Sequence, residues 1–195
     1  MNAGDWDRRY AATDLVWGQG PNQFLVSELA DLRPATGLDV ACGEGRNALW
    51  LAERGCQTIG VDYSAVAIDK ARAIAAKREL QVSFEVADVC TWRCPVSVEL
   101  AIIFYLQLPW DKMQAAIANT AAAVEPGGTI LIVGHDLENL TRGTGGPQDP
   151  EVLYTPEMLS GCLDGFEIVR AETVERPVEA KTNPAIDNLV RALKV

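Results

Sequence analysis

The stretch from Gly37 to Ala48, GLDVACGEGRNA, constrains the fold of this chain more than any other segment. An apolar run, LDVA, contains one acidic side chain and ends in the turn Gly43-Glu44-Gly45. A segment with helical character, ALWLAERG, follows directly. Glycines allow a tight turn whose backbone approaches a ligand closely, and a helix N-terminus presents free N–H groups to it. The sequence therefore predicts a strand, a turn and a helix that together bind a small ligand.

An acidic residue lies in or at the carboxyl end of each of three successive predicted strands. Asp39 lies inside the first strand, Asp62 ends the second in GCQTIGVD, and Asp88 follows the third at Ala87-Asp88. A carboxylate at the end of the second strand is suited to accept hydrogen bonds from ribose hydroxyls. Ligands of open α/β sheets bind at the carboxyl ends of the strands, near the topological switch point. These residues predict a nucleoside-binding site.

Strand-like and helix-like segments alternate along the chain, which predicts an α/β fold with a mainly parallel sheet and helices on both faces. Glu125–Gly128 (EPGG) is expected to stop a helix and turn, and Gly143–Pro150 is the clear Gly/Pro-rich loop. The predicted strands are 37–41, 57–61, 82–86, 98–104, 129–134, 166–174 and 186–193. The predicted helices are 21–32, 45–54, 64–80, 111–124 and 155–162.

Length and charge limit the classes of partner. The chain has 195 residues, which fits one domain, and 27 acidic against 17 basic residues give a formal net charge of -10. Such acidity disfavours nucleic acid and membranes as partners. The polar N-terminus lacks a signal-peptide core, and the longest apolar run, 100–106, is too short to span a bilayer. We expect a cytoplasmic monomer or homodimer with a small-molecule substrate.

The five cysteines do not form a metal-binding pattern. Cys90 and Cys94 are the one close pair, and no second pair or nearby histidine completes a zinc site. We therefore expect no metal, and thiols that are reduced and mostly buried.

The motifs together resemble those of the class I S-adenosylmethionine-dependent methyltransferases, from Trp6 to the C-terminus. LDVACGEGRNA is similar to the first motif of that class, VDYSAVAIDKA to the second, Ala87-Asp88 to the adenine-side motif, and EPGGTILIVG to the segment that builds the fifth strand. The resemblance implies a doubly wound, Rossmann-like sheet of seven strands, mostly parallel, with the last strand antiparallel. It also implies a single domain, with residues 1–33 as an N-terminal cap and entry helix and residues 34–195 as the core.

One position departs from the class pattern. Ala41 stands where the first motif usually has glycine, and we expect its methyl group to be tolerated because the tight turn depends on Gly43 and Gly45. Two further segments, WDRRYAATDLVWGQGPNQFLV and CGEGRNALWLAERG, resemble small bacterial methyltransferases related to the tellurite-resistance and thiopurine enzymes, which act on chalcogen centres.

The resemblance implies roles for the residues of the first motif. S-adenosylmethionine would be the cofactor and S-adenosylhomocysteine the product. The Asp39 carboxylate and the backbone of Ala41 and Gly43 would hold the methionine ammonium group. Arg46 or Trp17 would contact the methionine carboxylate.

The resemblance also implies how the nucleoside half and the methyl group are bound. Asp62 would bind both ribose hydroxyls, and Tyr63 would pack on the adenine. Asp88 would accept from the adenine amino group, with the Val89 backbone nearby. Tyr105, just after the fourth strand, would border the transferred methyl group.

The residues that follow the fifth strand are candidates for catalysis. His135, the one histidine of the chain, follows that strand directly, and Asp136 is next to it. If the acceptor is a thiolate, a selenide or a similar soft anion, no general base is needed. If it is an oxygen or an amine, His135 or Asp136 would be the base. The 143–150 loop is either a lid or a plain surface loop.

Two other functions are compatible with parts of the pattern. Gly43-x-Gly45-x-x-Ala48 also satisfies the loose dinucleotide fingerprint, so a nicotinamide-dependent oxidoreductase is one alternative. It would need a hydride-transfer site, yet the chain shows no Tyr-x-x-x-Lys pair and no substrate domain. A non-catalytic S-adenosylmethionine-binding protein is the other alternative. We expect Asp62→Ala to weaken cofactor affinity at least tenfold without loss of the fold, on the premise that Asp62 is exposed.

Overall fold

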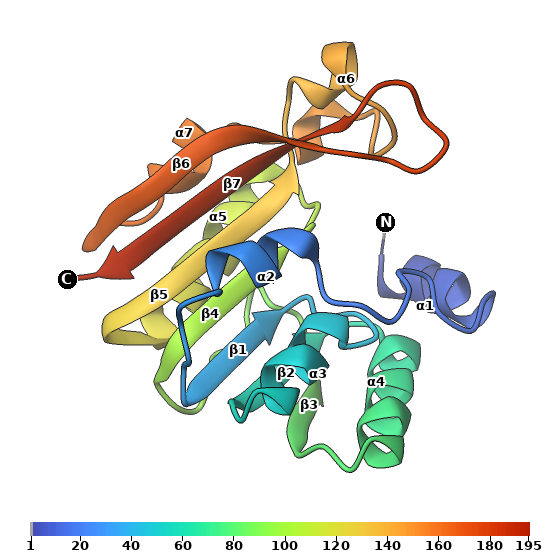
Figure 1. Ribbon diagram of the computed structural model, residues 1–195, viewed down its shortest axis with the longest axis vertical. Coiled ribbons are helices and arrows are strands. Elements are labelled where there is room, and N and C mark those ends of the chain that lie inside the picture. Colours follow the sequence, from blue (N-terminus) through green and yellow to red (C-terminus); the bar gives the residue numbers. More distant parts are fainter. Residues whose placement is uncertain (1) are drawn as a thin grey trace.

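The computed structural model describes residues 2–195 and is built on one seven-stranded sheet (Figure 1). The strands are β1 (Thr36–Val40), β2 (Gln57–Asp62), β3 (Val82–Val86), β4 (Val98–Phe104), β5 (Val124–His135), β6 (Phe166–Arg176) and β7 (Ala185–Lys194). The helices are α1 (Ala3–Ala11), α2 (Gln23–Glu28), α3 (Arg46–Glu53), α4 (Ala65–Lys77), α5 (Trp110–Ala123), α6 (Asn139–Arg142) and α7 (Pro156–Ser160), with a 3₁₀ turn at Pro150–Val152. None of these helices is long and apolar enough to cross a membrane.

The strand order is β3-β2-β1-β4-β5-β7-β6. The pairs from β3 to β5 are all parallel, whereas β7 is antiparallel to both β5 and β6. The predicted fold class is confirmed: the chain forms a seven-stranded, mostly parallel α/β sheet with an antiparallel last strand. From β1 the chain adds β2 and β3 toward one edge of the sheet and then β4 and β5 toward the other. The boundary between β1 and β4 is therefore the switch point of a doubly wound fold.

Alternate residues of the central strand β4 face opposite layers of the molecule. Leu100 and Ile102 belong to the cluster that includes Leu25 of α2, while Ala101 and Ile103 belong to the cluster that includes Ile117 of α5. All four β4 residues are buried, as expected for a strand covered on both faces. Figure 1 shows α2 in front of the sheet and α5 behind it. This packing fixes the sheet that carries the site.

The segment Glu125–Gly128 differs from the sequence prediction. We expected EPGG to stop a helix and form a turn, but β5 begins at Val124, directly after α5. Val124 pairs with Val98, the register then shifts, and regular pairing resumes between Thr129 and Leu100. Pro126 has no N–H to donate, and Gly127 takes a φ of 81°, so the extra residues form a bulge inside the strand.

Three helices differ from the sequence prediction. The entry helix is shorter than 21–32 at both ends. The side chain of Asn22 accepts a hydrogen bond from the Phe24 N–H and starts α2 at Gln23, and the helix ends at Glu28 with Leu29 as its C-cap. Helix α1 was not predicted as a separate element. Its N-terminus is closed by a capping box between Asn2 and Asp5. These two polar residues add nothing to the apolar periodicity from which the other helices were predicted. Helix α6 was not predicted either.

The N-terminal segment is held on α4, beside which α1 lies in Figure 1. The Lys70 ammonium of α4 donates to the backbone carbonyls of Tyr10, Thr13 and Asp14, at 2.5, 2.5 and 3.1 Å. It also donates to Glu44 Oε1 at 3.1 Å. One cation therefore satisfies the carbonyls at the end of α1 and the segment that follows it.

We predict that Lys70→Met releases the N-terminal segment. The change leaves these carbonyls without their charged donor, and hydrogen bonds to charged groups contribute about 1.5–3 kcal/mol each. Limited proteolysis within residues 2–22 should therefore be faster by at least about tenfold. Lys77→Met, at the exposed end of the same helix, is the control and should behave as wild type. Equal cleavage rates in both variants would show that Lys70 does not hold the segment.

Candidate active site

The turn between β1 and α3 has an unusual backbone. Ala41, Gly43 and Gly45 all have positive φ, at 58°, 54° and 78°. A Cβ atom on Gly43 would lie 2.6 Å from the Tyr10 hydroxyl, and one on Gly45 would lie 2.9 Å from the ring of Phe84. Both glycines are therefore required by conformation and by space. Ala41 is in a conformation that disfavours any residue with a Cβ, which the sequence reasoning did not foresee.

Two strand carboxylates hold this turn in place. Asp39 Oδ2 accepts a hydrogen bond from the Ala48 N–H at 3.0 Å, inside α3. Asp62 accepts from the Gly43 N–H at 2.9 Å with Oδ2, and from the Ser64 N–H at 2.8 Å with Oδ1. Our premise that Asp62 lies at an exposed strand end is wrong, because its side chain is buried against the turn and is 6% exposed. Replacing Asp62 by alanine would remove this support as well as any ligand contact.

Asp39 is a buried acid without a cation in hydrogen-bond contact. It is 1% exposed, and the Ala48 N–H is its hydrogen-bond donor among residues 2–195. Burial raises the pKa of Asp39 to about 7, although the Ala48 hydrogen bond and the charge of Arg46 oppose the shift. Burial also raises the pKa of Asp62. A cationic ligand beside these acids would stabilise their charged forms.

The ends of β2 and β3 bring three other predicted residues to the same edge. The Ala87 N–H donates to the Asp62 carbonyl at 3.0 Å, which places Asp88 next to the end of β2. Asp88 is exposed, and its Oδ1 accepts from the Cys90 N–H at 2.9 Å. Tyr63 is half-buried, and burial, followed by the charges of Asp62 and Asp88, raises its pKa to about 12.

Val89 follows in the same turn and is buried in the core beside β1. The structure therefore gathers the four residues predicted for the nucleoside end. They are Asp62, Tyr63, Asp88 and Val89.

An aromatic cluster of the N-terminal segment covers the turn. Tyr10 is buried over Gly43, its ring stacks on Trp6 at 5.7 Å between centroids, and its hydroxyl accepts from Trp17 Nε1 at 3.2 Å. Trp17 itself is 43% exposed, and its carbonyl accepts from Arg46 Nη1 at 3.1 Å. The structure thus brings Trp17 and Arg46 together at the turn, as their predicted roles require. Sequence reasoning missed Tyr10, for which the signal was its i,i+4 spacing from Trp6.

Tyr105 belongs to a second polar group, centred on Asp187 of β7. Asp187 Oδ2 accepts from the Tyr105 hydroxyl at 2.7 Å and from Arg176 Nε at 2.7 Å, and Arg176 Nε lies 3.0 Å from the Tyr105 hydroxyl. Tyr105 directly follows β4 and has a φ of 55°. Strained backbone of this kind is concentrated at functional sites.

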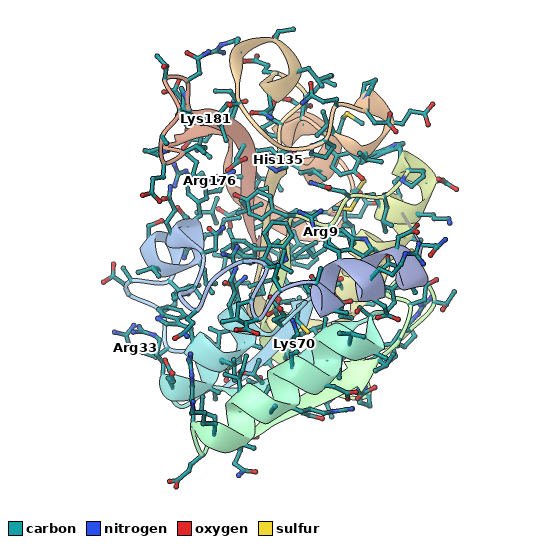
Figure 2. The ribbon with its side chains drawn as sticks, turned by 90° about the vertical axis from the view of Figure 1, so that its right-hand side faces the viewer. Arg9, Arg33, Lys70, His135, Arg176 and Lys181 are labelled. Carbon is teal, nitrogen blue, oxygen red and sulfur yellow. The ribbon has the colours of Figure 1, made fainter. Side chains whose placement is uncertain are left out.

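His135, at the end of β5, joins the same group. Its Nδ1 lies 3.1 Å from Asp187 Oδ1, and its ring centroid lies 5.0 Å from that of Tyr105. Gly146, in the 143–150 loop, also lies against the ring, since a Cβ atom there would be 3.0 Å from it. Figure 2 shows His135 and Arg176 close to each other, above the level of Lys70.

Asp187 is the centre of this second group because it stays ionised. Burial alone would raise the pKa of Asp187, but hydrogen bonds from His135, Arg176 and Tyr105 outweigh it and lower the pKa. Sequence reasoning missed both Asp187 and Arg176. An acid inside the apolar strand AIDNLVRAL was the available signal, by the same argument that applied to Asp39.

Asp136 is placed differently from the base that we predicted. It is 1% exposed, and its two oxygens accept from the Glu138 N–H at 2.8 Å and the Thr173 hydroxyl at 3.2 Å. One oxygen therefore holds the backbone after β5 and the other binds a side chain of β6, so Asp136 is engaged in structural contacts rather than presented to a ligand. No group of three metal-ligating side chains occurs within residues 2–195. The five cysteines are free, with Cys42 and Cys56 buried and the other three half-buried.

Known proteins share this fold and part of this sequence. Residues 38–128 match the methyltransferase domain family. A 2-heptyl-1-hydroxyquinolin-4(1H)-one methyltransferase of Mycobacteroides abscessus is 28% identical over 147 residues, which cover 70% of this chain and 64% of that protein. The chain thus spans slightly less than two thirds of the length of this curated relative.

Solved structures match over most of the chain. The crystal structure of TehB from Haemophilus influenzae has a TM-score of 0.74 and 19% identity, over 89% of this chain and 62% of that one. The N-methyltransferase NodS of Bradyrhizobium japonicum, in complex with S-adenosyl-L-homocysteine, has a TM-score of 0.73 and 19% identity, over 100% and 99%. Because both sequences are only 19% identical to this chain, these two matches show a shared fold and nothing further.

We predict that Ala41→Gly stabilises the protein. Glycine removes the steric cost of a φ of 58°, which is about 1–2 kcal/mol, and adds conformational entropy to the unfolded chain, which offsets part of the gain. The free energy of unfolding in urea should rise by about 0.5–1 kcal/mol. Ala75→Gly, inside α4 with ordinary helical geometry, is the control and should lower it. A loss of stability in Ala41→Gly would show that the strain is absent.

We also predict that Asp39→Asn removes a pH dependence of stability. As pH rises from about 4 to about 7, the unfolded chain releases the Asp39 proton while the native protein keeps it, so the free energy of unfolding falls in that window. The asparagine variant keeps the acceptor for Ala48 but not the titration. Its stability relative to wild type should therefore rise by up to about 4 kcal/mol between these pH values. A difference that is constant with pH in denaturant titrations would contradict the shifted pKa.

Proposed function

We propose that this chain, which carries a methyltransferase domain of the class I S-adenosylmethionine-dependent type over residues 38–128, transfers a methyl group from S-adenosylmethionine to a small-molecule acceptor. The observation that carries this proposal is the buried Asp39 carboxylate beside the 41–45 turn. Asp39 lacks a cation in contact, and S-adenosylmethionine is cationic at its ammonium and sulfonium groups. The residues present therefore fit this cofactor.

Each end of the cofactor has candidate contacts. Asp39 and the backbone of Ala41 and Gly43 would hold the ammonium group, and Arg46 the carboxylate. Tyr10 and Trp17 would close over this end and exclude water. The exposed Trp17 indole lies at the rim, where it can cover a ligand.

At the other end, Asp62 still has a lone pair for a ribose hydroxyl, since the backbone donors of Gly43, Ser64 and Tyr63 leave part of the roughly four acceptor positions of a carboxylate free. Tyr63, Asp88 and the Val89 backbone would hold the adenine. The cofactor supplies an electrophilic methyl group whose sulfonium charge disappears during transfer. The protein then contributes mainly by alignment, which supplies up to about 7–11 kcal/mol.

The acceptor class is the finer part of the proposal. The resemblance of the N-terminal segment to chalcogen methyltransferases supports a thiol or another chalcogen centre. The name of the Mycobacteroides relative supports a hydroxylated heteroaromatic ring instead. A screen of thiols, tellurite, selenite and small phenols, read by release of S-adenosylhomocysteine, separates these classes.

The remaining expectations are proposals of the same kind. We propose one domain over residues 1–195, a monomer or homodimer in the cytoplasm, and no nucleic-acid partner, given the net charge of -10. The two alternative functions, a non-catalytic S-adenosylmethionine-binding protein and a nicotinamide-dependent oxidoreductase, are tested by calorimetry and turnover. Binding of NAD without binding of either sulfur ligand would refute the proposal. Turnover with any acceptor would exclude a non-catalytic role.

We predict that Asp62→Asn weakens S-adenosylmethionine binding at least about tenfold, because it removes the charge that strengthens hydrogen bonds from the ribose. Asparagine keeps an oxygen for one of the two backbone donors, so the fold should persist. Isothermal titration calorimetry gives the affinity, and circular dichroism checks the fold. Asp69→Asn, exposed on α4, is the control. Unchanged affinity in a folded Asp62→Asn protein would place the ribose elsewhere.

A further inference from the structure

We propose that His135 is the general base of the transfer, that Asp187 positions its imidazole, and that the acceptor is a small molecule with an ionisable hydroxyl group. This inference rests on the methyl transfer proposed above. It adds to that proposal the atom that is methylated and a residue, Asp187, whose role is to act through His135.

The packing around His135 fixes the ring. Tyr105 and Gly146 both lie against it, and Nδ1 lies 3.1 Å from Asp187 Oδ1. Both of these atoms are buried, and neither makes a well-directed hydrogen bond to another described residue. Buried polar atoms without other partners require an explanation, and a proton shared between them supplies one. That proton belongs on Nδ1, because an ionised carboxylate only accepts.

With the proton on Nδ1, the second ring nitrogen is free to act as a base. Nε2 of His135 has no hydrogen-bond partner among residues 2–195, and unlike Nδ1 it is not fully buried. The side chain as a whole is 12% exposed. A histidine whose Nδ1–H is held by a carboxylate presents a lone pair on Nε2. His135 therefore offers an accessible proton acceptor directly after β5, next to the residue that follows β4.

The charged neighbours of His135 favour this role. The titratable and charged groups that face it are Asp187, Tyr105 and Arg176, since the loop residue Gly146 brings no charge. Tyr105 is a poor base, because burial, together with the charge of Asp187, raises its pKa. Hydrogen bonds from His135, Arg176 and Tyr105 lower the pKa of Asp187, so its carboxylate stays ionised.

Arg176 supplies a cation for an oxygen anion. Its Nε is used by Asp187 and Tyr105, but its two terminal nitrogens make no hydrogen bond to other residues in the described part of the chain. The side chain is 24% exposed, so these nitrogens can reach a ligand. A guanidinium with free donors suits an anionic oxygen.

A base beside the transfer site distinguishes between acceptor classes. A thiolate or selenide is already an anion and needs none, whereas a hydroxyl group must lose its proton. His135 Nε2 would take that proton as the acceptor oxygen forms a bond to the methyl carbon. The carbon–sulfur bond breaks, its electron pair stays on sulfur, and the imidazolium later returns the proton to solvent.

The first test uses the protein without cofactor or acceptor. His135 is the one histidine in the chain, so the ring nitrogens of a ¹⁵N-labelled protein without a histidine tag need no assignment. In the neutral ring we expect the proton on Nδ1 and a lone pair on Nε2. In Asp187→Asn, the amide oxygen is expected to accept from Arg176 and Tyr105, so the NH₂ group faces His135 and the proton moves to Nε2. A wild-type proton on Nε2 would overturn the proposal.

The second test measures the acceptor preference. Matched phenols and thiophenols, naphthols and naphthalenethiols, and hydroxyquinolines and quinolinethiols are assayed over pH. We expect His135→Gln and Asp187→Asn to lower kcat for hydroxyl acceptors by at least about 100-fold and to leave thiol rates unchanged. Glu175→Gln, beside Arg176 on the exposed face of β6, is the control and should behave as wild type.

The outcomes separate this inference from the proposed function. Two outcomes would refute the role of His135 as general base while leaving methyl transfer intact. One is wild-type protein that methylates thiols but no hydroxyl compound, and the other is a His135→Gln variant that keeps its rate with phenols. If calorimetry finds no S-adenosylmethionine binding in wild type, the proposed function fails, whatever the tautomer. Unchanged cofactor affinity in a folded Asp187→Asn protein, together with a lower kcat, supports the inference. The ¹⁵N–¹H spectrum of each variant reports whether it is folded.

Discussion

The hydrogen bond from the Gly43 N–H to Asp62 Oδ2 is the contact on which the rest of the site depends. It joins the turn after β1 to the end of β2, and the other oxygen of Asp62 starts α4 through Ser64. Because α4 in turn holds the N-terminal segment through Lys70, the buried carboxylate connects the sheet, the turn and the covering aromatic cluster. A charge buried to this extent is costly, and the backbone donors offset that cost. The site is therefore preorganised by the same groups that are proposed to bind the ligand.

Two buried acids, one in β1 and one in β7, have pKa values shifted in opposite directions. Asp39 has one backbone donor and an elevated pKa, whereas Asp187 has three side-chain partners and a lowered pKa. The first is short of positive charge and suits a cationic ligand. The second is bound by Tyr105 and Arg176 and faces His135, so it serves to orient these side chains. Burial is severe for both residues, and the number of donors decides which behaviour results.

Local patterns were sufficient to predict much of the fold. The bounds of β3 and β4 agree with the prediction residue for residue, because β3 alternates apolar and polar residues and β4 is nearly all apolar. The glycine turn and the acids near it were also found from short segments. Asp187 and Arg176 were not, since they meet Tyr105 across 82 and 71 residues of chain, and only the register of β7 between β5 and β6 brings them there. The bulge at Gly127 was missed because a Pro-Gly-Gly run is equally typical of a turn that ends a helix.

The attachment of the N-terminal segment to α4 divides the molecule into two parts that should differ in their tolerance to amino-acid substitution. The segment, the glycine turn and α4 contact one another, so a change in any of them disturbs the others. The residues between β5 and β7 place Gly146 and Arg176 around His135 and Asp187, and within residues 2–195 they make no hydrogen bond to α1 or α4. Substitutions in the 136–184 region should therefore disturb the glycine turn and α4 less than a change at Lys70 does. Tolerance to substitution should thus differ between the two parts of the molecule, and the contacts of one lysine set the boundary between them.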